Sequence, residues 1–85
     1  MNRKLTIERL STYAVFLRSG RSLEITEELI NLLFDILSYI TVNNREMLSK
    51  LQEIFSAILK CQETEDWLGM ADYLEYELKD YLKSL

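Results

Sequence analysis

The 85-residue sequence contains no proline and no histidine, and it has only two glycines and one cysteine. Histidine is the commonest general base and a frequent metal ligand, so its absence excludes most catalytic and metal-centred schemes. Proline and glycine usually form the turns of β-rich domains, so their scarcity argues against such a fold. The single cysteine, Cys61, cannot form an internal disulfide, which favours a reducing compartment.

Long apolar runs are absent as well. No uninterrupted apolar stretch approaches the ~20 residues that a membrane-spanning helix needs. Near the start of the chain, Glu8 and Arg9 fall where a signal peptide would require an apolar segment. We therefore expect a cytoplasmic protein without a membrane span.

The charges are unevenly distributed along the chain, although the net charge is only −4. Residues 1–21 carry five basic side chains and one acidic one, whereas residues 22–85 carry five basic and thirteen acidic ones. An acidic body repels phosphate backbones, and five scattered cations are too few for a nucleic-acid surface. The sequence therefore predicts no nucleic-acid partner and favours contacts with protein.

The apolar residues recur at helical spacing throughout, and no segment alternates like a strand. Gly20 is placed to end the first helix, and Ser22 to cap the second. Asn43 and Glu46 imitate a capping box for the third helix, and Thr64 is placed to cap the fourth, with Glu65 and Asp66 in its first turn. The pattern predicts one all-α domain, an up-down four-helix bundle with a shorter first helix, whose helices cover about residues 4–18, 23–42, 45–62 and 65–84.

The predicted core follows apolar stripes on these helices. The second helix has an apolar sector about 180° wide, so it should touch two or more neighbours. The third and fourth helices show the alternating three- and four-residue spacing of a left-handed bundle. Cys61 lies on the stripe of the third helix, so we expect a small core residue and not a reactive thiol. The stripes are Met47, Leu51, Ile54, Ile58 and Cys61, and then Trp67, Ala71, Leu74, Leu78, Tyr81 and Leu85.

One carboxylate falls on an apolar face. Glu75 lies on the apolar side of the fourth helix, where Lys79 at i+4 can pair with it. We predict no catalytic residue, no cofactor-binding residue and no metal ligand, because a single carboxylate is no active site. A carboxylate-dependent metal or small-molecule site around Asp72 and Glu75 is kept as one hypothesis.

Several aromatic side chains lie off the predicted stripes. Phe34 falls among polar residues of the second helix, Tyr73 and Tyr76 lie off the stripe of the fourth, and Phe16 widens the face of the first. Aromatic residues are enriched in the buried centres of protein interfaces. We therefore predict a non-enzymatic protein that acts through protein–protein contacts, as a homodimer or with another partner. The alternative is a chaperone-like or adaptor module that binds a partner's amphipathic helix.

Residues 66–78, with the sequence DWLGMADYLEYEL, resemble a segment of small all-helical proteins of Gram-positive bacteria. In those proteins an Asp-aromatic pair leads into a helix similar to Leu-Ala-Asp-x-Leu-Glu-Tyr-Glu-Leu. The resemblance implies a bacterial helical protein and no particular activity. In size and helix number the chain is also similar to flagellar and secretion export chaperones, which bind a helix of an exported protein in an apolar groove. That similarity concerns architecture only.

Overall fold

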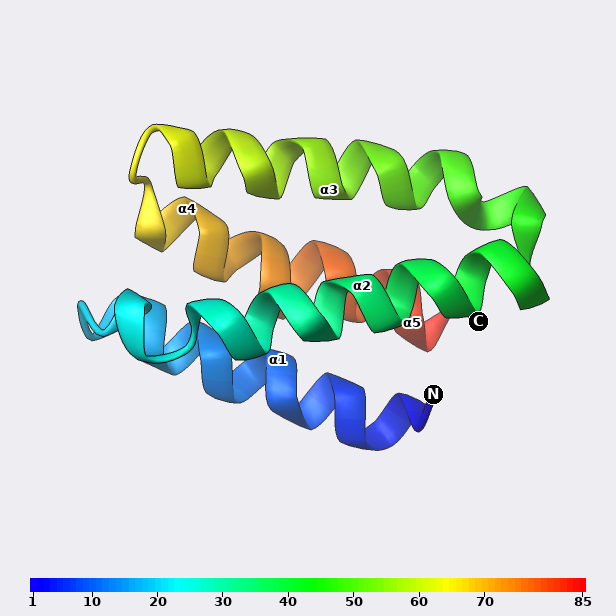
Figure 1. The fold of residues 1–85 in the computed structure, drawn as a ribbon, viewed down its shortest axis with the longest axis horizontal. Helices are drawn as coiled ribbons and strands as arrows, with labels where there is room; N and C mark the ends of the chain where they lie inside the picture. Colours follow the sequence, from blue (N-terminus) through cyan, green and yellow to red (C-terminus); the bar gives the residue numbers. More distant parts are fainter.

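In the computed structural model, which describes all 85 residues, four antiparallel helices form an up-down bundle, as predicted, with both termini at one end (Figure 1). The first helix has 16 residues, against 17 to 19 for the other three. None of the helices is both long and apolar enough to cross a membrane. The elements are α1 Arg3–Arg18, the 3₁₀ turn η1 Ser22–Glu24, α2 Thr26–Asn43, the 3₁₀ turn η2 Arg45–Met47, α3 Leu48–Glu63, and a continuous C-terminal helix made of α4 Trp67–Asp72, the π-helical segment η3 Tyr73–Leu78 and α5 Lys79–Lys83.

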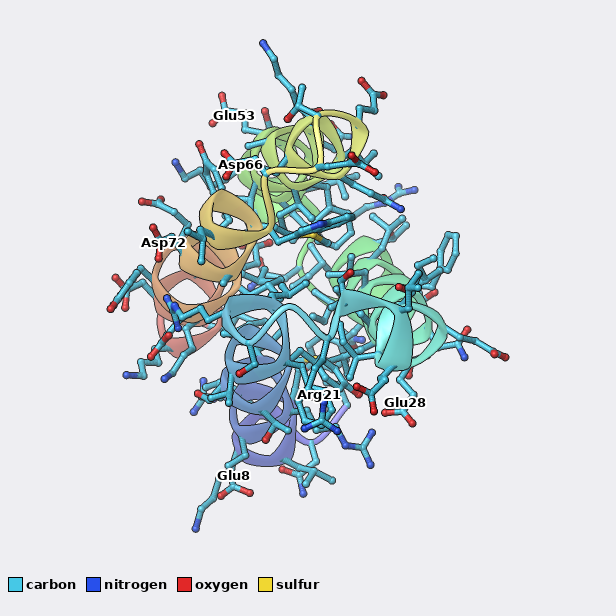
Figure 2. The ribbon with its side chains drawn as sticks, turned by 90° about the vertical axis from the view of Figure 1, so that its left-hand side faces the viewer. Glu8, Arg21, Glu28, Glu53, Asp66 and Asp72 are labelled. Carbon is cyan, nitrogen blue, oxygen red and sulfur yellow. The ribbon has the colours of Figure 1, made fainter.

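Viewed along its length, the bundle has a helix at each of four corners (Figure 2). The C-terminal helix packs between α1 and α3, and α2 packs against α3. Two spaces on either side of α2 remain at the surface, one toward α3 and one toward α1.

A single apolar core fills the bundle. The stripes predicted for α3 and the C-terminal helix supply one side of this core, although Met47, Cys61, Trp67 and Leu85 are only partly buried at its edge. Tyr81 is buried, and its hydroxyl donates a hydrogen bond of 2.9 Å to the carbonyl of Met47. The buried apolar residues are Leu10, Tyr13, Ala14, Leu17, Ile25, Leu29, Leu32, Ile36, Ile40, Leu51, Ile54, Ile58, Met70, Ala71, Leu74, Leu78, Tyr81 and Leu82.

The π-helical segment changes the register of the C-terminal helix. A π turn holds more residues than an α turn, so the apolar stripe shifts by part of a turn after it. Leu74 and Leu78 remain buried within the segment, and both Tyr81 and Leu82 are buried beyond it. The predicted stripe contained Tyr81 and omitted Leu82, because it followed a single line of alternating three- and four-residue steps, although Leu82 lies four residues after Leu78 on the same face.

Two helices end in the same left-handed turn. After α1, Gly20 has φ of +74°, and the Arg21 amide donates to the Phe16 carbonyl at 2.9 Å. After α3, Glu65 takes the equivalent position with φ of +56°, and the Asp66 amide donates to the carbonyl of Cys61, five residues earlier, at 2.8 Å. Both are Schellman motifs, which normally place glycine at the left-handed residue. Glu65 therefore carries a strained backbone that the sequence did not indicate.

The capping box predicted at Asn43 and Glu46 is wrong. Asn43 is the last residue of α2, and its side-chain amide donates to the Tyr39 carbonyl at 3.1 Å. Glu46 lies in the 3₁₀ turn that precedes α3. Asn44 lies between α2 and this 3₁₀ turn, and its buried side-chain oxygen accepts no hydrogen bond. The extra 3₁₀ turn displaces α3 by three residues, which separates the predicted cap from the helix.

The caps of the second and fourth helices differ from the prediction too. Ser22 opens the 3₁₀ turn η1, and α2 begins only at Thr26. Thr64 ends α3, while Asp66 is the residue that caps α4, its carboxylate accepting a hydrogen bond from the Gly69 amide at 3.0 Å. Asp66 and Glu65 thus precede the helix and do not lie in its first turn.

Candidate interaction surface

An apolar groove runs along the surface between α2 and α3. It encloses about 260 Å³, and every residue that lines it is apolar. Phe34 is 62% exposed and Leu59 is 54% exposed, which is unusual for large apolar side chains that lie beside one another. The α2/α3 groove is lined by Ile30, Leu33, Phe34, Leu37, Phe55 and Leu59.

The groove follows from the wide apolar sector of α2. One edge of that sector, with Leu29, Ile36 and Ile40, is buried in the core. The other edge continues around the helix to Phe34, beyond the reach of the core. α3 covers only part of this side of α2, so Ile30 and Phe34 stay at the surface.

The four aromatic residues predicted to bind a partner do not form one surface. Phe34 belongs to the α2/α3 groove. Phe16 is half-buried under the Arg21 guanidinium, whose carbon lies 4.5 Å from the ring centre. Tyr73 is half-buried and Tyr76 is 58% exposed, and both lie on the outer face of the C-terminal helix. Only Phe34 is therefore grouped with other exposed apolar side chains.

The remaining groove residues were missed or assigned to the core. Leu33 and Leu37 belong to the wide apolar sector of the second helix, and Phe55 lies beside the stripe of the third. Their spacing predicts burial, but the structure leaves each of them partly exposed. Ile30 and Leu59 were not singled out, because each lies at the edge of a stripe. The available signal was the 180° width of the apolar sector on the second helix, which exceeds what one neighbour can cover.

Glu75 does not pair with Lys79 as predicted. Its carboxylate forms an ion pair with Arg18 of α1, which also bonds Asp72 at 2.8 Å. Lys79 instead donates a hydrogen bond of 2.9 Å to the hydroxyl of Ser11. The hydrogen bonds that the Arg18 guanidinium donates to Glu75, and then to Asp72, raise its pKa. The cation that neutralises these two carboxylates is thus supplied by the protein itself.

Cys61 is partly buried beside the core. Burial, and then the negative charge of Asp66, raise the pKa of the Cys61 thiol. Because the thiolate is the nucleophilic form, this environment suppresses its reactivity.

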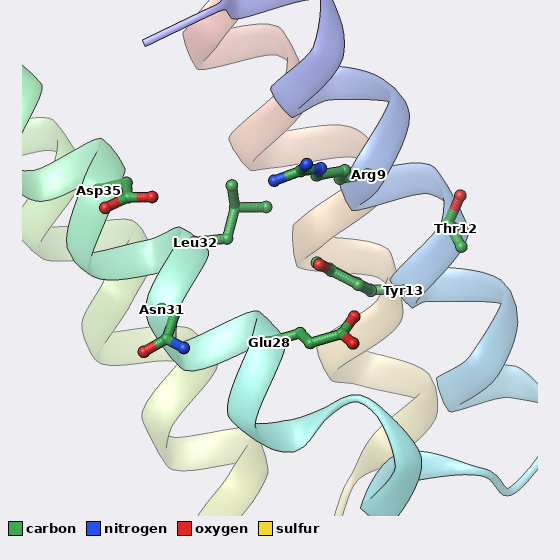
Figure 3. Close-up of a pocket in the computed structure, with 7 residues that line it drawn as sticks. All are labelled: Arg9, Thr12, Tyr13, Glu28, Asn31, Leu32 and Asp35. Carbon is green, nitrogen blue, oxygen red and sulfur yellow. The ribbon is translucent and has the colours of Figure 1, made fainter.

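A polar cleft lies on the other side of α2, between this helix and α1 (Figure 3). It encloses about 470 Å³. Tyr13 of α1 extends into the space, with Arg9 and the Glu28 carboxylate reaching in from the two helices (Figure 3). The α1/α2 cleft is lined by Arg9, Thr12, Tyr13, Glu28, Asn31, Leu32 and Asp35.

No curated protein and no solved structure matches the chain. A family model described as a domain of unknown function (DUF8042) matches residues 6–85, which include all four helices except the first turn of α1. The chain therefore belongs to this family.

Proposed function

We propose that this protein is a non-enzymatic helical module that works through protein–protein contacts, and that its partner in the α2/α3 groove is a second copy of itself. The observation that carries the proposal is the grouping of Phe34 and Leu59, both more than half exposed, in a groove lined only by apolar residues. Exposed apolar surface of this kind is typical of interaction sites.

The groove contains both parts that a symmetric dimer needs. In a two-fold interface the same patch must fit itself, so it requires a projection and a hollow. The ring of Phe34 supplies the projection, and the groove supplies a hollow of about 260 Å³. Since a cavity of about 150 Å³ is enough to hold benzene, the hollow has room for a phenyl ring of the partner.

The absence of charge in the groove also favours a second copy. None of the six lining residues is polar or charged, so a charged segment of another protein would gain no ion pair there. Standard interfaces bury about 800 Å² on each partner, with an apolar centre and a polar rim. The groove provides such a centre, and the polar faces of α2 and α3 beside it provide the rim.

The alternative partner is an amphipathic helix of another protein, as in a chaperone-like or adaptor module. A groove between two antiparallel helices suits this mode of binding, in which anchors recur at i, i+3, i+4 and i+7. The hypothesis of a metal or small-molecule site at Asp72 and Glu75 has less support, because such a ligand would have to displace Arg18 from both carboxylates.

Sedimentation velocity from micromolar to millimolar concentration tests the proposal. We expect the wild-type protein to shift from monomer to dimer with concentration. Leu59→Glu should keep the protein monomeric, because it places a charge in the centre of the interface. Leu68→Glu is the matched control: Leu68 is 63% exposed but lies outside the groove, so this variant should still dimerise.

A wild-type protein that remains monomeric over the whole range would overturn the proposed self-association. A dimer that Leu68→Glu disrupts and Leu59→Glu does not would show that a different surface is used. If the protein stays monomeric but binds an amphipathic helix of another protein, and Leu59→Glu weakens that binding, the adaptor alternative replaces the dimer.

A further inference from the structure

One end of the α2/α3 groove carries two carboxylates. Glu27 lies seven residues before Phe34 on α2, so it is two helical turns away on the same side of the helix. Glu63 lies four residues after Leu59 on α3, one turn further along the same side. Because α2 and α3 run antiparallel, the start of α2 and the end of α3 lie at the same end of the bundle (Figure 1). Both carboxylates are exposed and neither takes part in an ion pair, so this end of the groove stays negatively charged.

The opposite end of the groove has no charge at the corresponding positions. Thr41 lies seven residues after Phe34 on α2, and Gln52 lies seven residues before Leu59 on α3. Phe34 is therefore midway between Glu27 and Thr41 along α2. The groove has an acidic end and an uncharged end, and this difference distinguishes the two ways in which a second copy can lie on it.

The whole molecule is polarised in the same direction. Its longest dimension is 34 Å, and the helices run along it (Figure 1). At the end with the termini and η2, residues 1–10, 40–50 and 79–85 together carry seven basic and three acidic side chains. At the end with η1 and the connection between α3 and α4, residues 18–28 and 59–72 carry three basic and seven acidic side chains. The bundle thus has a basic end and an acidic end.

We infer that the two copies of the proposed dimer lie antiparallel, with the acidic end of each groove against the uncharged end of the partner's groove. The two-fold axis of a self-complementary patch passes through its middle. The groove residues on α2, at positions 30, 33, 34 and 37, are centred close to Phe34, so the axis lies at the level of Phe34. The inference rests on the proposed self-association and adds the orientation of the partner.

Charge favours the antiparallel arrangement over the parallel one. In a parallel dimer, Glu27 and Glu63 of the two copies would gather four carboxylates at one end of the interface, and like charges that face each other across an interface disfavour the arrangement strongly. In an antiparallel dimer, each pair of carboxylates faces the partner's Thr41 and Gln52. The basic end of each bundle then lies beside the acidic end of the other, which adds a favourable charge interaction to the apolar contact in the groove.

Disulfide trapping distinguishes the two orientations. With a rise of about 1.5 Å per residue, Glu27 and Thr41 lie about 10 Å on either side of Phe34 along α2. In the antiparallel dimer, Glu27 of one copy is therefore level with the partner's Thr41, whereas the two Glu27 residues are offset by about 20 Å. A disulfide needs Cα atoms within about 7 Å of each other, so only positions at the same level can link.

Each variant for trapping also carries Cys61→Ser, so that the new thiol is its only one. Glu27→Cys and Thr41→Cys are oxidised separately and as an equimolar mixture, at a concentration where sedimentation shows a dimer, and mass spectrometry identifies the products. We expect the mixture to give the mixed disulfide in at least about tenfold greater yield than either variant gives its symmetric one. Leu68→Cys is the matched control: Leu68 is exposed but lies outside the groove, so this variant should link to neither.

The dissociation constant provides a second measurement that needs no cysteine. The double variant Glu27→Gln, Glu63→Gln removes both carboxylates from the groove end. A parallel dimer would tighten at least about tenfold because repulsion is relieved, whereas we expect no tightening of an antiparallel dimer. The matched control is Glu8→Gln, Glu77→Gln, which changes the net charge equally at exposed positions outside the groove and should behave as the wild type does.

The negative outcomes separate this inference from the proposed function. A wild-type protein that never dimerises overturns both. If the dimer forms but Glu27→Cys links mainly to itself, or the double glutamine variant tightens the dimer about tenfold relative to its control, the copies are parallel and only the orientation is overturned. A dimer that links in no combination overturns the orientation as well, because its axis then lies away from Phe34.

Discussion

Truncation of Phe34 to alanine separates its role in association from its role in folding. An aromatic side chain buries about 150–250 Å² in total. Phe34 is 62% exposed in the monomer. About 90–155 Å² of its surface is therefore left for a partner to cover, which is worth about 2–4 kcal/mol per copy at about 25 cal/mol per Å².

A symmetric dimer loses this contribution twice. The sum over two copies is about 5–8 kcal/mol, so we expect Phe34→Ala to raise the dimer dissociation constant at least about a thousandfold. The smaller buried part of the ring contributes only about 1.5–2.5 kcal/mol to the folding of each monomer. The variant should therefore lose its dimer while keeping a cooperative unfolding transition.

Sedimentation equilibrium gives the dissociation constant, and urea unfolding of the dilute monomer, followed by the fluorescence of Trp67, gives the free energy of unfolding. Tyr76→Ala is the matched control, since Tyr76 is 58% exposed and lies outside the groove. It should leave the dissociation constant within about twofold of the wild type. The reasoning is refuted if Phe34→Ala destabilises the monomer by about 3 kcal/mol or more while the dissociation constant is unchanged, because the ring would then pack within its own chain.

Three further predictions concern the helix ends and the core. Glu65→Gly should raise the free energy of unfolding by about 0.5–1 kcal/mol in urea titrations, because glycine takes the left-handed conformation without the strain that Glu65 bears. Gly69→Ala should be neutral or destabilising in the wild type, where the new methyl would meet the Asp66 carboxylate that caps the helix, but stabilising by about 1 kcal/mol in the Asp66→Ala background; an equal effect in both backgrounds would contradict the clash. Tyr81→Phe should cost about 0.5–1.5 kcal/mol at pH 7 by removing the bond to the Met47 carbonyl. Burial raises the pKa of Tyr81, so its stabilising effect is complete below its unfolded pKa and is lost as the pH rises through the folded pKa; the wild type should therefore lose stability above about pH 10 more steeply than Tyr81→Phe, as unfolding curves at several pH values would show.

Apolar spacing predicted the fold because burial of large side chains dominates the energy of a helix in a bundle. Leu51, Ile54 and Ile58 are all buried along α3, as their spacing indicated. Leu74 and Leu78 are buried on the C-terminal helix for the same reason. The prediction of these buried residues does not depend on the helix boundaries, so an error of a residue or two at either end leaves it unchanged.

Apart from the end of α1 at Gly20, which the sequence predicts, the helix ends could not be predicted in the same way, because each depends on one or two hydrogen bonds. Asn43 and Asn44 are both good capping residues by type, and only the 3₁₀ turn after α2 decides that neither caps α3. Thr64 and Asp66 compete likewise before α4, and the left-handed turn at Glu65 favours Asp66. No residue type in this segment indicates that turn, because glycine or asparagine is the usual choice there.

The partner of Glu75 was missed for a different reason. Residue spacing shows which side chains are neighbours on one helix, and Lys79 is such a neighbour. It does not show which other helix lies alongside, and α1 brings Arg18 to Glu75 across 57 positions of the chain. Because α1 lies beside the C-terminal helix, Arg18 reaches the carboxylates of both Asp72 and Glu75. Glu75 therefore pairs with Arg18 and not with Lys79.

The α2/α3 groove and the α1/α2 cleft arise from one property of α2, the different chemistry of its two flanks. Its buried row of Leu29 and Ile36 divides the helix. On the flank toward α3, the residues at Ile30 and Phe34 continue the apolar sector into the groove. On the flank toward α1, the positions are polar, so α2 and α1 enclose a cleft and do not close a dry contact. Because a packed row of the core separates the groove from the cleft, a substitution in the cleft, such as Asp35→Asn, should leave the association through the groove intact.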